Sequence, residues 1–282
     1  MEAIALGPLV FPLERLAAIA AVAVLLLAVW VLSRRMEAAQ AARLDRWAWR
    51  AVILGALAGR GVHVAQHWDS FAPEPWRILA FWQGGFSAQG ALVAVAAVTL
   101  LELGRRNLPP LGRPIALSLG LALATWVGVL LLKGPLYAPG PPEQVFTAID
   151  GREISLAERE GRPAVVNLWA TWCAPCRREL PMMADLADAH PGIDVIFANQ
   201  REAPQTVGLF LATEGLRLSN VVLDETGVLG RHYGVLGLPT TLFLDPGGQV
   251  VERHVGEISR EAFAAALGRL QELEPALAPA ED

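Results

Sequence analysis

Cys173 and Cys176 are the two cysteines of this 282-residue chain, and they stand three positions apart. They belong to the run Trp172-Cys173-Ala174-Pro175-Cys176, which directly follows an apolar segment. Thiols at this spacing can close a small disulfide and exchange it with another protein through a mixed disulfide. A zinc site would need further His or Cys ligands nearby, which the sequence does not supply. An inert structural disulfide is the other alternative, and we favour a redox-active dithiol.

Two predicted elements position this pair. Residues 163–170 are rich in Val and Leu and predict a buried strand, and a helical pattern runs over residues 176–189. Cys173 would then lie at the first turn of a helix, where free N–H groups and the helix dipole stabilise a thiolate. The two arginines after Cys176 should lower the thiol pKa further. We therefore expect Cys173 to be the thiolate that attacks a disulfide and Cys176 to resolve the resulting mixed disulfide.

The composition divides the chain into two unlike halves. Residues 1–140 carry 12 basic and 7 acidic side chains, whereas residues 141–282 carry 11 basic and 21 acidic ones. With 54% hydrophobic residues, the whole chain is too apolar for one soluble domain. The acidic second half has no basic patch, which argues against nucleic acid as a partner.

Residues 1–134 predict a membrane region of about four α-helical spans. The segments are residues 16–32, which reach a spanning length when extended back toward Leu9, and residues 47–68, 78–101 and 115–132. The loops 33–45 and 102–114 each hold three arginines, while the loop 67–76 carries Asp69 and Glu74 without Lys or Arg. By the positive-inside rule, the arginine loops face the cytoplasm and both termini lie outside. The dithiol would then be in an oxidising, extracytoplasmic compartment of a bacterial cell.

The membrane half resembles prolipoprotein diacylglyceryl transferase. The similarity covers residues 5–100 and depends on Leu6-Gly7-Pro8-Leu9, the Gly59-Arg60-Gly61 turn and Phe81-Trp82-Gln83-Gly84-Gly85-Phe86-Ser87-Ala88-Gln89-Gly90. Gln89 stands where that family has a histidine, and the family's later catalytic signature is missing. The resemblance therefore implies an incomplete relative that serves as an anchor in the lipid bilayer, with transferase activity as a minor alternative.

Three further residues of this half could bind something. His63 and His67 would share one helix face, where a metal or haem ligand role competes with an ordinary place at the membrane boundary. Arg60 falls mid-span, where a charge is costly. Contact with a lipid head group and snorkelling of the side chain are equal alternatives for it.

The second half alternates strands and helices, which predicts a central sheet with helices on both sides. A Pro/Gly linker over residues 135–142 leads into a domain at 143–275, followed by a tail at 276–282. Expected strands cover residues 146–149, 163–170, 193–198, 220–223, 240–244 and 249–255. Expected helical segments cover residues 156–160, 176–189, 206–214, 228–233 and 260–273.

This half resembles the thioredoxin superfamily, closest to its membrane-tethered TlpA/ResA-like branch. The landmarks are the run from Val166 to Cys176, Glu179-Leu180-Pro181, Gly237-Leu238-Pro239-Thr240-Thr241 and the turn 245–248. The resemblance implies a thioredoxin-like α/β fold, a cis-proline at Pro239 and an acidic partner of the dithiol at Glu179. Pro239, Leu238 and Trp172 would help to bind substrate. Asn167 replaces the buried aspartate of ordinary thioredoxins, which gives Glu179 more weight as the proton carrier.

We therefore expect a membrane-anchored thiol-disulfide oxidoreductase that reduces disulfides in exported proteins, for example in cytochrome c maturation. Without cysteines of its own, the membrane half cannot relay electrons by thiol exchange, so a donor of the CcdA or DsbD type is implied. Neither a cofactor nor a metal is expected. The alternatives are a disulfide-donating oxidant of the same fold and a dithiol module that binds or delivers a metal.

Overall fold

The computed structural model describes residues 3–6, 9–104, 111–132, 139–159 and 161–273. Two compact units result: a helical unit over 13–133, and an α/β unit over 134–282 that also includes the first 12 residues. Several sequence predictions concern residues outside the described ranges. These are Gly7 and Pro8, Arg105 and Arg106, residues 135–138 of the linker and the tail 276–282.

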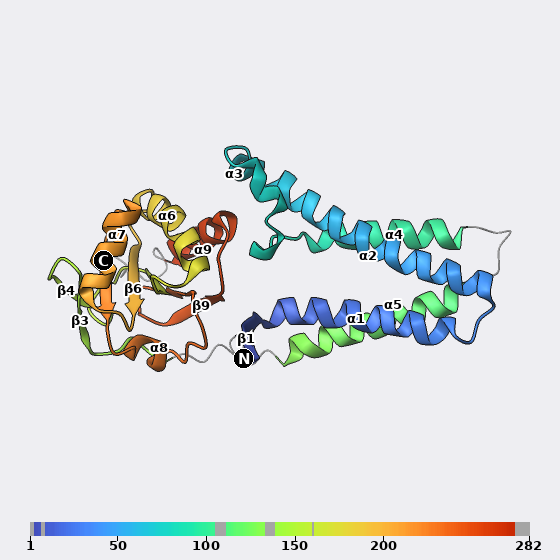
Figure 1. The fold of residues 1–282 in the computed structure, drawn as a ribbon, viewed down its shortest axis with the longest axis horizontal. Coiled ribbons are helices and arrows are strands. Elements are labelled where there is room, and N and C mark those ends of the chain that lie inside the picture. The colour runs from blue at the N-terminus through green and yellow to red at the C-terminus, as the bar shows by residue number, and fades with distance from the viewer. Residues whose placement is uncertain (1–2, 7–8, 105–110, 133–138, 160, 274–282) are drawn as a thin grey trace, which may run out of the picture. The chain divides into compact units, whose positions relative to one another are not determined.

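The helical unit pairs long helices side by side (Figure 1). Helix α1 packs against α5, and α2 packs against α4. Their shared core includes Leu44, Trp47, Ala51 and Ile115. The helical elements are α1 (Leu13–Ser33), α2 (Ala38–Gln66), α3 (Trp68–Phe71), the 3-10 turns η1 (Pro75–Leu79) and η2 (Phe81–Gln83), α4 (Ala88–Leu103) and α5 (Gly112–Leu131).

Two of the described helices, α1 and α5, are long and apolar enough to cross a membrane. Helix α4 is apolar but spans only 16 residues. The prediction of one continuous span over residues 78–101 is therefore wrong. Gly84 and Gly85 adopt positive φ angles of 84° and 79°, which a helix does not allow, and α4 begins only after them.

Arg60 supplies the second reason for this break. Its guanidinium group donates hydrogen bonds to the carbonyl oxygens of Arg77, Ile78, Gly84 and Gly85, over 2.6 to 3.0 Å. The Arg77 carbonyl also accepts a 3-10 hydrogen bond from the Ala80 amide at 3.0 Å, because a carbonyl oxygen has two lone pairs. The charge in the middle of α2 thus binds the segment of 3-10 turns and loop that precedes α4.

The α/β unit is built on a five-stranded sheet with the order β7-β6-β5-β8-β9. Strands β5, β6 and β7 run parallel, whereas β8 and β9 run antiparallel to their neighbours. Two hairpins, β1-β2 and β3-β4, are separate from this sheet. The strands are β1 (Ala3–Leu6), β2 (Leu9–Pro12), β3 (Val145–Thr147), β4 (Glu153–Ser155), β5 (Ala164–Trp169), β6 (Asp194–Gln200), β7 (Val221–Asp224), β8 (Thr240–Leu244) and β9 (Val250–Val255).

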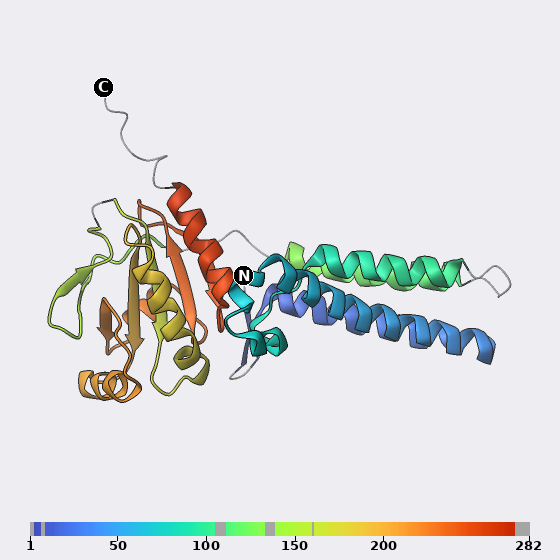
Figure 2. The ribbon, with the colours of Figure 1, turned by 90° about the horizontal axis from the view of Figure 1, so that it is seen from above.

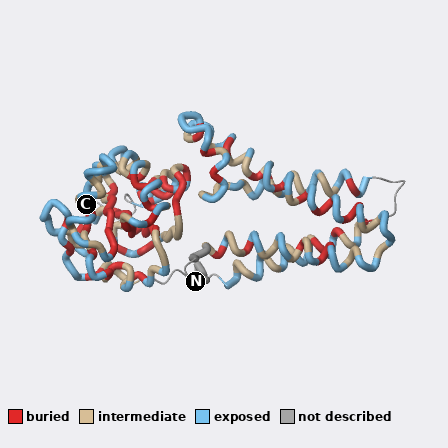
Figure 3. The backbone as a smooth tube through the Cα atoms, viewed as in Figure 1, coloured by how far each residue is buried: buried red, intermediate tan, exposed pale blue. Residues whose placement is uncertain are grey.

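Both faces of the sheet are covered, which explains why all residues of β5 are buried. On one face, α6 (Ala174–Asp188), α7 (Pro204–Glu214) and α9 (Arg260–Leu273) enclose a core that includes Trp169 and Phe243. On the other face, the β3-β4 hairpin and α8 (Val228–His232) enclose a second core with Leu168 and Tyr233. Figure 2 shows α6 and α9 along the sheet, and Figure 3 shows the buried residues at the centre of this unit.

Most predicted elements of this half are confirmed to within a few residues, but the helical segment at 156–160 is wrong over its described residues 156–159. Those residues form a bend after β4. The hydroxyl of Ser155 accepts hydrogen bonds from the amides of Ala157 and Glu158. The Arg159 guanidinium then donates to the carbonyl of Leu156 at 2.8 Å. These side chains satisfy the backbone locally, in competition with a helix.

Candidate active site at the cysteine pair

Cys173 and Cys176 form a disulfide with a Cα–Cα distance of 5.3 Å. Cys173 is the N-cap residue of α6, and its sulfur accepts a hydrogen bond from the amide of Cys176 at 3.3 Å. The position predicted for Cys173 at the start of a helix is therefore confirmed. Cys173 is 4% exposed and Cys176 is fully buried. The N-terminal sulfur is thus the one nearer to solvent.

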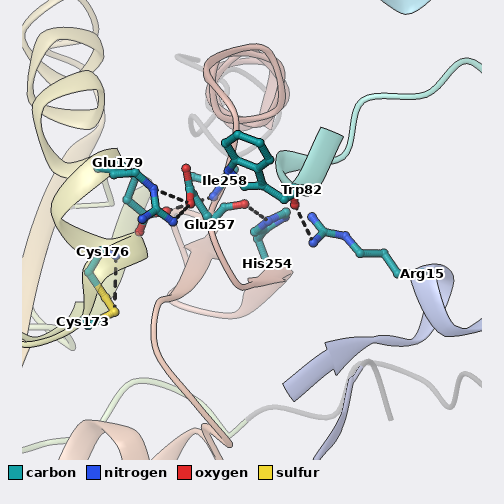
Figure 4. A network of polar contacts seen from close by, with 9 residues as sticks. Arg15, Trp82, Cys173, Cys176, Glu179, His254, Glu257 and Ile258 are labelled. Atoms are coloured by element: carbon teal, nitrogen blue, oxygen red, sulfur yellow. Dashed lines mark hydrogen bonds and ion pairs between the residues drawn. A yellow bond between two sulfur atoms is a disulfide. The ribbon is translucent and has the colours of Figure 1, made fainter. Parts of the chain in front are cut away.

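Glu179 lies one turn beyond Cys176 on the same helix and is only 2% exposed. Its carboxylate accepts two hydrogen bonds of 2.9 Å, from Asn167 Nδ2 on β5 and from the amide of Ile258 before α9. Burial raises the pKa of Glu179 to about 8, although both hydrogen bonds act to lower it. Figure 4 shows this carboxylate together with the disulfide. A buried carboxyl group that titrates near the ordinary thiol pKa therefore lies beside the dithiol.

The two arginines after Cys176 are both engaged in ion pairs. Arg177 binds Glu214 at 2.6 Å, and Arg178 binds Glu257, whose side chain is buried. The Glu257 hydrogen bond raises the pKa of Arg178. Because a paired guanidinium group has its charge largely compensated, the effect of these arginines on the thiols is smaller than the sequence suggested.

The loop that ends in Pro239 is brought to the dithiol by strand pairing. Thr240 pairs with Leu168 and Thr241 pairs with Asn167, so β8 starts beside the end of β5. The Leu238–Pro239 peptide bond is cis. Trp172, which directly precedes Cys173 in the chain, is 72% exposed. Loops after β5 and before β8 therefore hold Trp172, Cys173, Leu238 and Pro239, whereas Cys176 and Glu179 lie on α6.

Sequence reasoning missed Glu202. Its carboxylate accepts hydrogen bonds from the Thr171 amide at 2.7 Å, from the Thr171 hydroxyl at 2.5 Å and from Asn199 Nδ2 at 2.8 Å. Thr171 begins the turn that leads to Cys173. Glu202 follows β6, the parallel neighbour of β5, and the carboxyl ends of such strands meet at one edge. That rule could have identified it from the sequence.

His63 and His67 both belong to the helical unit. Their ring centroids are 4.4 Å apart, and His67 Nδ1 contacts the carbonyl of His63 at 2.9 Å. Among the described residues, no group of three or more His, Cys, Asp or Glu side chains is arranged to hold a metal ion.

Comparisons with known proteins match the two halves separately. Residues 141–253 match the AhpC/TSA family, and residues 4–129 match the prolipoprotein diacylglyceryl transferase family. The thiol-disulfide oxidoreductase ResA of Bacillus thuringiensis (strain Al Hakam) is 32% identical over 131 residues, which are 46% of this chain and 75% of that protein. The thioredoxin-like protein YneN of Bacillus subtilis is 32% identical over 124 residues, or 43% and 72% of the two chains. The StoA structure from Bacillus subtilis is 26% identical with a TM-score of 0.41, covering 47% of this chain and 98% of StoA.

The thioredoxin-like fold and the disulfide at the start of α6 define a thiol-disulfide oxidoreductase. By its similarity to the Bacillus proteins, the chain belongs to the ResA family of these enzymes. A prolipoprotein diacylglyceryl transferase-like region precedes the oxidoreductase domain, so the predicted fusion is confirmed.

Proposed function

We propose that this protein is anchored in a bacterial plasma membrane and reduces disulfides of exported proteins on the extracytoplasmic side. The observation that carries the proposal is the arrangement of the Cys173–Cys176 disulfide beside the buried Glu179. The membrane anchor would be the helical unit, in which α1 and α5 are long and apolar enough to cross a membrane. The arginine-rich loops 33–45 and 102–114 support a cytoplasmic position for the ends of the helices that these loops join.

In the reduced protein, the thiolate of Cys173 attacks one sulfur of a substrate disulfide. That S–S bond breaks, a mixed disulfide forms, and the other substrate sulfur leaves as a thiol. Cys176 then loses its proton and attacks the Cys173 sulfur, which releases the second substrate thiol and regenerates the disulfide seen in the structure. Two electrons have passed to the substrate, and a membrane dithiol donor of the CcdA or DsbD type must return them with two protons.

Glu179 is proposed to accept the Cys176 proton. A carboxyl group with a pKa of about 8 and a thiol with an ordinary pKa of about 8.5 exchange a proton at little cost. A carboxylate with an unshifted pKa would be a much weaker base at neutral pH. Pro239, Leu238 and Trp172 are proposed to contact the substrate next to its disulfide.

The reduction potential of the full chain in lipid nanodiscs tests the direction of electron flow. The protein is equilibrated with glutathione or dithiothreitol buffers, and the free thiols are alkylated and counted by mass spectrometry. We expect a potential near the roughly −270 mV of thioredoxin or below. A potential near the roughly −120 mV of DsbA would instead make the protein a disulfide donor.

The two native cysteines also test the topology, because the chain has no others. After mild reduction of intact expressing cells, a membrane-impermeant maleimide should label Cys173, the more exposed of the two. Labelling that requires cell lysis would place the α/β unit in the cytoplasm and contradict the proposal.

A further inference from the structure

A groove beside the dithiol differs in charge from the rest of its domain. Its volume is about 560 Å³, within the range of ligand sites. The lining residues are Trp172, Gln200, Arg201, Gly230, Arg231, Gly234, Val235, Leu236, Gly237 and Leu238. Trp172 adjoins Cys173 and Leu238 adjoins Pro239 in the chain, so whatever occupies the groove lies next to the reacting sulfur.

The charged side chains of the lining are two arginines, Arg201 and Arg231. Among the described residues that line the groove there is no Asp or Glu. This contrasts with residues 141–282 as a whole, which carry 21 acidic and 11 basic side chains. A cationic groove in an acidic domain is complementary to an anionic ligand.

The nearby carboxylates are directed to other groups. Asp224 is buried and accepts hydrogen bonds from Gln200 Nε2 and from the amides of Val228 and Leu229. Glu202 is occupied by Thr171 and Asn199. Within the described part of the chain, neither arginine of the groove forms an ion pair with a carboxylate. Both arginines are exposed residues, so they are accessible to a ligand.

Local contacts hold both arginines in place. The backbone of Arg201 has a φ angle of +60°, an uncommon conformation for a non-glycine residue. Its side chain lies across Gly227, where an added Cβ would stand 2.5 Å from Arg201 Nε. Arg231 Nη1 donates to the carbonyl of Thr226 at 2.6 Å, which fixes the second guanidinium group.

We propose that this groove selects protein substrates with an acidic side chain close to their disulfide. Arg201 and Arg231 would bind the carboxylate, while Trp172, Leu236 and Leu238 would cover an adjoining apolar side chain. This inference rests on the proposed reductase function and adds its substrate class.

The test compares three peptides that share one intramolecular disulfide and differ only in flanking Glu, Gln or Lys residues. The full chain in nanodiscs, reduced beforehand, is mixed with each peptide at low ionic strength, and the second-order rate constant of peptide reduction is measured. We expect the Glu peptide to react about 3- to 10-fold faster than the Gln peptide, as two exposed ion pairs would allow, and the Lys peptide to be slowest. Added salt should reduce the difference.

Variants assign the effect to the groove. R201Q/R231Q should bring the Glu-to-Gln rate ratio to about 1, whereas R201K/R231K should keep most of it. R217Q removes an exposed arginine outside the groove lining and should leave the ratio unchanged. Equal rates for the three peptides, or an unchanged ratio in R201Q/R231Q, would overturn the inference while leaving the reductase function intact. No reduction of any peptide would overturn the proposed function and this inference with it.

Discussion

Asn167 Nδ2 donates a hydrogen bond of 2.9 Å to Glu179 Oε1, and both side chains are buried. The Oδ1 atom of the same Asn167 has no hydrogen-bond partner among the described residues. A rotation of the amide by half a turn would present this oxygen to Glu179. Asn167 can therefore donate to the carboxylate or accept from the protonated acid, which suits a group that gains and loses a proton.

The raised pKa of Glu179 makes stability depend on pH. Between its ordinary value of 4.5 and about 8, the folded protein holds a proton that the unfolded chain releases, so stability falls as pH rises through this window. A shift of this size corresponds to roughly 5 kcal/mol. In E179Q we expect the decline in the free energy of unfolding from pH 5 to pH 8 to become much smaller, as measured by urea titration of the full chain. The exposed-site variant E272Q should keep the wild-type decline, and an unchanged decline in E179Q would contradict the pKa assignment.

E179Q should also slow the release of reduced substrate. Loss of a general base costs on the order of 10² in rate, and the pH step near 8 should disappear. Formation of the mixed disulfide by Cys173 should change little. Rapid quenching with acid, followed by mass spectrometry, separates the two steps. If mixed-disulfide formation were slower in E179Q and substrate release were normal, Glu179 would serve as the base for Cys173 instead.

The different burial of the two sulfurs predicts different phenotypes for single cysteine variants. C176S keeps the more exposed Cys173 but cannot resolve, so it should accumulate a mixed disulfide with a model substrate. C173S should form almost none. Non-reducing electrophoresis and peptide mass mapping provide the measurement. Equal trapping by both variants would mean that Cys176 is also open to attack.

Glu202 should act as a positioning residue for the turn before Cys173. E202A leaves the Thr171 amide without its acceptor, which should cost about 1 to 3 kcal/mol of stability and shift the pKa of the reduced Cys173 thiol. E202Q should recover much of the loss, because the unpartnered Oδ1 of Asn199 can accept from the new amide. Iodoacetamide alkylation rates against pH measure the thiol pKa. A stability loss in E202A without any change in that pKa would reduce Glu202 to a purely structural role.

In the helical unit, Arg43 and Glu102 form a buried ion pair between α2 and α4, with a shortest distance of 2.7 Å. E102Q removes the charge that compensates Arg43 and should destabilise this unit by about 3 to 5 kcal/mol. R43M/E102M removes both charges and should be closer to the wild type. Thermal unfolding in nanodiscs measures both variants, and equal losses would show that the pair is not coupled.

The sequence predicted the parts of this molecule that depend on short-range patterns. The Cys173 and Cys176 spacing, the apolar run of β5 and the helix after it are local features, and all three are confirmed. Glu179 was found only through the family resemblance. Its pKa depends on burial under residues far along the chain, such as Ile258, which no local pattern contains.

The errors arose where a side chain overrides the local preference of the backbone. Residues 78–101 are uncharged, but their hydropathy takes no account of Arg60 on α2. Its guanidinium group donates hydrogen bonds to the carbonyls of Ile78, Gly84 and Gly85. Residues 156–159 have helical composition, but Ser155 and Arg159 satisfy their backbone otherwise. Glu202 escaped notice because its place after the predicted strand β6 was not weighed, although the edge rule for parallel strands makes such a residue a candidate; only its partner Thr171 needed the strand order of the folded sheet.

Because both cysteines of this chain form one disulfide, its thiols can hold at most two electrons per molecule. In the proposed reductase cycle, a second substrate disulfide would therefore wait until a donor has reduced the pair again. Substrate would meet the dithiol and donor the disulfide, each through the slightly exposed sulfur of Cys173, so the two encounters would alternate.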